Sequence, residues 1–167
     1  MFYALFFLFI AADFLRPIEP PEKPEAAITM LDIATDFRGI KFRSKPNLGK
    51  GYFFYEKDGD TLVYRKAKDY MNVNGIPVDD VYYVFWEKKF LGGVMLCYTA
   101  DDCLEPLYEM LSPKLGEGYL KEGSERVVWF GDNAYLILKR EDDGTGRLMM
   151  FDRETVLEIK WAPVEGL

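Results

Sequence analysis

The sequence predicts an α+β fold in which an antiparallel meander sheet of about seven to nine strands carries one principal helix on one face. Three observations predict it. Short aromatic and β-branched runs recur along the chain with turn residues between them. Only one segment, at about residues 102–112, has a helical period. Of the 167 residues, 49% are hydrophobic and 16% aromatic, which is enough to form a core without metals. We therefore expect one globular domain over residues 28–167.

The first 27 residues differ from this pattern. Residues 2–12 (FYALFFLFIAA) form an unbroken apolar run. It is shorter than the roughly 20 residues that cross a bilayer, and its length is typical of the apolar part of a secretory signal. We interpret residues 1–15 as a signal-like or anchor segment. A buried first helix or strand of a cytosolic domain is the alternative.

Residues 16–27 (RPIEPPEKPEAA) contain four prolines and little to bury, so we interpret them as a linker with extended geometry. The order of apolar run, linker and globular body predicts an exported, periplasmic or membrane-tethered protein. Membrane contact would be made through residues 2–12. A cytoplasmic location is the alternative.

The strands of the first half follow from turn signals. An Asp-Gly pair separates the runs 52–56 and 61–65, and an Asn-Gly pair follows at 74–75; both pairs favour tight hairpins because they tolerate positive φ. The runs 81–86 and 90–98 give the next hairpin.

The helix is predicted from Leu104, Leu107, Tyr108 and Leu111, which fall on one helical stripe. Asp102 with Glu105 predicts a capping box at its start, and Ser112-Pro113 predicts its end. After it, the runs 127–130, 134–139, 147–152 and 155–161 predict a second group of antiparallel strands.

The composition excludes several chemistries. The chain has no histidine, so Ser-His-Asp and Cys-His nucleophiles and His-ligated zinc cannot form within it. We predict no catalytic residue, no metal and no cofactor. Cys97 and Cys103 predict a disulfide in an exported protein, with two free thiols as the alternative.

Three adjacent carboxylate pairs occur, and each has a structural interpretation: Asp79-Asp80 begins a strand, Asp101-Asp102 precedes the helix, and Asp142-Asp143 lies in a turn. A site for acid-base chemistry or a cation is the alternative. A hydrolase that uses only carboxylates needs two of them across a cleft.

Charge is segregated along the chain. Its formal net charge is −7, which argues against nucleic acid as a partner. Residues 38–68 nevertheless hold nine basic and three acidic residues, a net of +6, whereas residues 69–167 hold ten basic and nineteen acidic ones, a net of −9. If folding keeps this separation, one surface can meet an anionic partner; mixing with acids from neighbouring strands is the alternative. The candidate residues are Arg38, Lys41, Arg43, Lys45, Lys50, Arg65, Lys66 and Lys68.

Two resemblances concern parts of the chain, and the first of them covers most of residues 34–152. The segment ATDFRGIKF, followed by strands, DDVYYVFWEKKFLGGVML, a short helix and WFG, resembles small exported bacterial proteins of unknown function. The C-terminal part, with Leu115-Gly116, Trp129-Phe130, Tyr135 and GRLMMFDRETVLEI, is similar in order to SmpA/OmlA-type envelope domains. Those domains have two helices before a three-stranded sheet and usually a lipid anchor. This sequence predicts neither feature, so no functional residue is carried over. The resemblance implies an interaction role in the envelope.

These observations together predict a non-catalytic binding domain of the bacterial envelope or secreted space. Its partner would be another protein or an anionic envelope component. A cytosolic acidic inhibitor or immunity-type protein is the first alternative, and a carboxylate-only hydrolase is the second.

Overall fold

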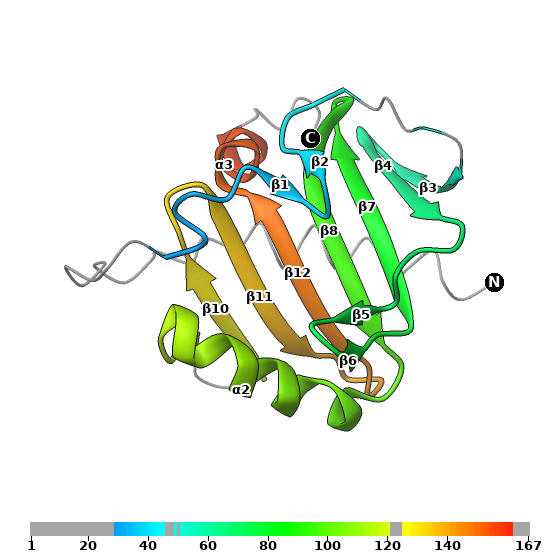
Figure 1. Cartoon of the computed structure of the whole chain (residues 1–167). Coiled ribbons are helices and arrows are strands. Elements are labelled where there is room, and N and C mark those ends of the chain that lie inside the picture. The colour runs from blue at the N-terminus through cyan, green and yellow to red at the C-terminus, as the bar shows by residue number, and fades with distance from the viewer. Residues whose placement is uncertain (1–28, 46–48, 50, 121–124, 162–167) are drawn as a thin grey trace.

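A computed structural model (Figure 1) describes residues 29–45, 49, 51–120 and 125–161. Its main sheet is antiparallel and has eight strands, so the predicted fold class is confirmed. The strands are β3 (Tyr52–Asp58), β4 (Thr61–Lys66), β7 (Asp80–Trp86), β8 (Lys89–Cys97), β9 (Tyr119–Leu120), β10 (Arg126–Phe130), β11 (Ala134–Arg140) and β12 (Gly146–Asp152).

Within the described residues, two small hairpins and three helical segments accompany this sheet. The hairpins are β1 (Asp36–Phe37) with β2 (Ile40–Lys41), and β5 (Asn72–Val73) with β6 (Ile76–Pro77). A 3-10 turn, η1 (Ala100–Asp102), leads into α2 (Leu104–Leu115), and α3 (Arg153–Trp161) follows the last strand. In the described part of the chain, no helix is long and apolar enough to span a membrane.

The main sheet consists of two meanders joined at its centre. Its strand order is β3-β4-β7-β8-β12-β11-β10-β9. Along the chain, the first four strands of this sheet (β3, β4, β7 and β8) are followed by α2, and the last four (β9 to β12) are followed by α3. The final strand of each group, β8 and β12, pair with one another.

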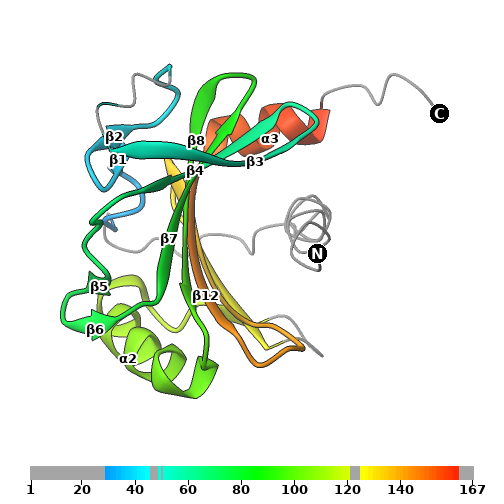
Figure 2. The same ribbon diagram turned by 90° about the vertical axis from the view of Figure 1, so that its right-hand side faces the viewer.

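The first face of the sheet holds α2 and both small hairpins, while α3 lies on the second face (Figure 2). Leu107 and Leu111 of α2 are buried in the first-face core, as their helical spacing predicted. Val156 of α3 belongs to the second-face core instead.

A glycine in β8 lets the first-face core close. A Cβ built on Gly93 would lie 2.0 Å from Cε1 of Phe37, whose ring is buried. Only a residue without a side chain lets β1 lie this close to the sheet.

The C-terminal element corrects a prediction. Residues 155–161, expected as a strand, lie in helix α3. Asp152 caps this helix, because its Oδ2 accepts hydrogen bonds from the Thr155 amide at 2.9 Å and the Thr155 hydroxyl at 2.6 Å. The spacing of Val156 and Ile159 then places both side chains toward the second face.

The bounds of α2 also differ from those expected. Its N-cap is Cys103, which makes no side-chain capping bond, so the predicted capping box is wrong. The helix continues through Pro113 to Leu115 and ends at Gly116, which has a φ of 83°, a backbone conformation that glycine adopts without strain. Pro113 has no backbone N–H to donate, but the packing of Leu107 and Leu111 in the core stabilises the helix enough for it to continue past this residue.

Candidate functional site

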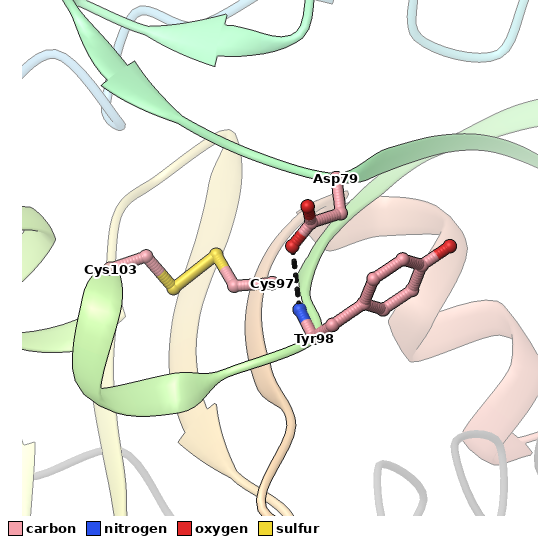
Figure 3. The surroundings of a disulfide bond; sticks show 4 residues. All are labelled: Asp79, Cys97, Tyr98 and Cys103. Atoms are coloured by element: carbon pink, nitrogen blue, oxygen red, sulfur yellow. Dashed lines mark hydrogen bonds between the residues drawn. A yellow bond between two sulfur atoms is a disulfide. The ribbon is translucent and has the colours of Figure 1, made fainter.

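The predicted disulfide is present between Cys97 at the end of β8 and Cys103 before α2 (Figure 3). Their Cα atoms are 6.5 Å apart and both residues are buried. The bond ties a central strand to the helix that covers the first face. Within the loop it closes, the Tyr98 amide donates to Asp79 at 2.7 Å.

A buried acid lies next to this loop. Asp80 is 3% exposed and pairs with Arg65, and its Oδ2 accepts hydrogen bonds from the hydroxyls of Tyr98 at 2.6 Å and Tyr82 at 3.3 Å. Burial, followed by the neighbouring Tyr55, raises the pKa of Tyr82, so this phenol stays protonated and keeps donating. Both oxygens of the Asp80 carboxylate thus face structural partners, Oδ2 through two hydrogen bonds and Oδ1 through the ion pair with Arg65.

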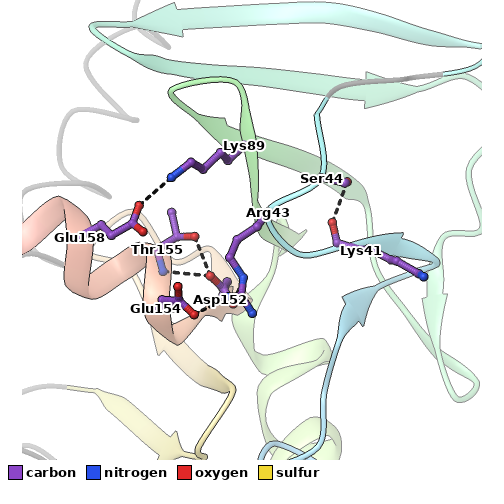
Figure 4. Close-up of polar contacts among 8 residues, drawn as sticks. All are labelled: Lys41, Arg43, Ser44, Lys89, Asp152, Glu154, Thr155 and Glu158. Carbon is purple, nitrogen blue, oxygen red and sulfur yellow. Dashed lines mark hydrogen bonds and ion pairs between the residues drawn. The ribbon is translucent and has the colours of Figure 1, made fainter.

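The three arginines of the basic segment pair with acids from the other part of the chain. Arg65 pairs with Asp80, as described above, and Arg38 with Asp69 at 3.1 Å. Arg43 reaches the start of α3, where it contacts Asp152 at 3.6 Å and also Glu154 (Figure 4). Folding therefore mixes the charges at these positions.

The lysines of the basic segment behave differently. Lys41, Lys45, Lys66 and Lys68 are exposed, and within the described residues none of them forms an ion pair. Lys50 lies outside the described residues. Arg65 stacks near the Tyr82 ring on the second face, whereas Lys66 lies over Tyr52 on the first. The candidate residues are thus divided between the two faces, and their binding to an anion stays a prediction.

An exposed aromatic edge adjoins Lys66, which is paired in register with Tyr52 of β3. Strand β3 is the first strand of the sheet and pairs only with β4 among the described elements. Its Phe53 and Phe54 are 47% and 56% exposed. Their presence in a strand was predicted, but an edge position depends on the order of all strands and has no local signal in the sequence.

The other carboxylate pairs are held by local contacts. Asp101 pairs with Arg140, and Asp143 accepts hydrogen bonds from the amide and hydroxyl of Thr145 at 2.9 and 2.7 Å. Although burial acts the other way, these bonds lower the pKa of Asp143. Across the described residues, no three cysteine or carboxylate side chains group as metal ligands.

The chain was compared with protein-family models, curated proteins and solved structures, and none of them matches it.

Proposed function

We propose that the protein is a non-catalytic binding domain that holds an extended, acidic segment of another protein along β3. The observation that carries this proposal is the edge position of a seven-residue strand. The outward backbone groups of such a strand can pair with an added strand. Lipid headgroups offer no strand, so this edge favours a protein partner over a membrane.

The side chains of β3 suit such a partner. Successive residues of a strand point to opposite faces, so Phe53 and Phe54 flank the edge on both sides. The Phe54 ring packs edge-on against Tyr64, with centroids 6.0 Å apart, which orients it. Aromatic side chains are enriched at the cores of protein interfaces.

Charge gives the partner a direction along the strand. Lys66 is paired in register with Tyr52 at the start of β3, with its Nζ 5.4 Å from that ring. Lys68 is exposed just beyond it, whereas Asp58 and Asp60 lie exposed at the hairpin turn. Acidic residues of the partner would therefore lie near Tyr52. A bulge between Phe54 and Glu56 limits regular pairing to the first half of the strand.

Two further features support the proposal: one concerns the non-catalytic role, and the other concerns a location outside the cytosol. The carboxylates of Asp79, Asp80, Asp101 and Asp143 are each engaged by structural partners. A disulfide between buried cysteines is typical of periplasmic and secreted proteins. Recovery of the protein from the cytosol with Met1 retained would favour the inhibitor or immunity-type alternative.

Photo-crosslinking tests the proposed surface. A photoreactive residue at Phe54 of the full chain, expressed in its own organism, should give one discrete protein adduct. The same residue at Lys114, which is exposed on α2, is the matched control and should give none. Adducts of equal yield at both positions, or adducts with lipid alone at Phe54, would contradict the proposal.

A further inference from the structure

The second face of the sheet carries a line of apolar side chains that crosses four strands. Strand register places Val128 of β10 opposite Ile137 of β11, which in turn lies opposite Met149 of β12. Met149 lies opposite Val94 of β8. Directly opposed residues share a face, and all four belong to the second-face core. We call these four residues the apolar row.

Solvent does not reach the apolar row. Its members Val128, Ile137, Met149 and Val94 are 2%, 3%, 4% and 2% exposed. The neighbouring strands cover such side chains only from the sides, because side chains stand roughly perpendicular to the sheet. Exposed fractions this low therefore require atoms packed on top of the row.

The described elements on this face lie away from the apolar row. Helix α3 lies at the upper end of the second face (Figure 2). It begins at Arg153, four residues beyond Met149, which is about 13 Å along the strand direction. The Phe130 ring packs against Tyr135, in the next line of residues toward α3. In the described part of the chain, no helix or strand lies over the apolar row, so the row requires a cover that these elements do not supply.

Composition indicates which part of the chain can supply this cover. Residues 2–12 (FYALFFLFIAA) form the longest apolar run outside the described residues. Residues 13–28 carry four prolines and six charged side chains, and residues 162–167 (APVEGL) include a proline and a glutamate. The internal segments outside the described residues are at most four residues long. Only residues 2–12 combine sufficient length with an unbroken apolar surface.

The connection is long enough for residues 2–12 to reach the apolar row. Leu31 lies at the β10–β11 turn, where its carbonyl accepts hydrogen bonds from the amides of Asn133 at 3.2 Å and Ala134 at 3.1 Å. Residues 13–28 precede this point, and sixteen residues span up to about 53 Å when extended. Four adjacent strands measure about 14 Å across, whereas eleven residues measure about 16 Å even as a helix.

We propose that residues 2–12 pack across the apolar row and form the remaining layer of the second face. The run is too short to cross a bilayer, and the row buries its apolar side chains within the domain instead. Residues 2–12 are then a buried first element, in place of a cleaved signal or a membrane anchor. The disulfide remains the observation that supports a location outside the cytosol. This inference is independent of binding at β3, because the apolar row and that strand share no residue.

Photo-crosslinking within the purified full chain tests the contact. A photoreactive residue is placed in turn at Phe6, Phe7 and Phe9, and peptide mass spectrometry locates the attachment in the monomer. At least one position should attach to the strands of the apolar row. The same residue at the exposed Phe54 is the control and should not attach to β10, β11 or β12. Attachment only to a second chain or to first-face elements, no attachment at all, or a mature N-terminus beyond Ala12 would overturn the proposal.

Thermal unfolding gives a second measurement. The triple variant Phe6→Asp, Phe7→Asp and Phe9→Asp places three acids in the proposed layer and should lower the melting temperature by about 5 °C or more. The matched triple variant Pro17→Asp, Ile18→Asp and Ala26→Asp adds three acids to the linker and should leave it unchanged. Equal melting temperatures of the first variant and the wild type, or equal losses in both variants, would overturn the proposal.

Discussion

Removing the disulfide should destabilise the protein by an amount that depends on the length of the loop that the bond closes. Cys97 and Cys103 are six positions apart, so the bond closes a loop of about seven residues. In the chain-entropy description, closing such a loop in the unfolded state stabilises the fold by about 2 kcal/mol. Because both cysteines are buried, Cys97→Ala with Cys103→Ala is a better replacement than two serines.

Urea unfolding followed by tryptophan fluorescence measures this change, since Trp129 is buried in the folded state. With a urea dependence of about 2 kcal/mol per molar, the midpoint of the double variant should fall by about 1 M. Dithiothreitol should lower the wild-type midpoint equally and leave that of the variant unchanged. A wild type that keeps its midpoint when mass measurement shows reduced thiols would refute the reasoning.

Three other changes follow from local geometry. Gly93→Ala places a Cβ 2.0 Å from the Phe37 ring and should lower the free energy of unfolding by about 1–3 kcal/mol in urea. Lys88→Gly should raise it by about 1 kcal/mol, because Lys88 sits at a φ of 62° in the β7–β8 turn; an unchanged midpoint would argue against strain there. Burial and then Asp58 raise the pKa of Glu56. The folded state thus holds this proton more tightly, so stability falls as pH rises through the pKa of Glu56, and Glu56→Gln should flatten that dependence; an identical pH profile would contradict it.

The strands and the principal helix could be predicted because their signals are local. Asn74 and Gly75 both adopt positive φ, as the hairpin signal requires. Leu107 and Leu111 are buried on the stripe that their spacing defined. These features depend on neighbours within a few residues, which the sequence displays directly.

Helix α3 was missed although a signal existed. A short run such as residues 155–161 has no clear period, and β-branched residues favoured a strand. The Asp152-x-x-Thr155 pattern was the available indication, since it places a capping carboxylate before a helix.

The candidate sites depend on long-range order. Strand β3 lies at an edge of the main sheet only because of the order in which all eight strands pair. The same is true of the pairing of Arg43 with Asp152, which neutralised part of the segment expected to be basic. Local sequence signals do not specify which strands become neighbours.

Crosslink yield at Phe54 in a charge-reversed background tests the central claim, an acidic protein segment bound along β3. Lys66→Glu with Lys68→Glu should reduce the yield by about tenfold or more, because two attractive charges near Tyr52 become repulsive. The matched Lys114→Glu variant should keep the wild-type yield. An adduct that forms equally well in all three proteins would contradict the account.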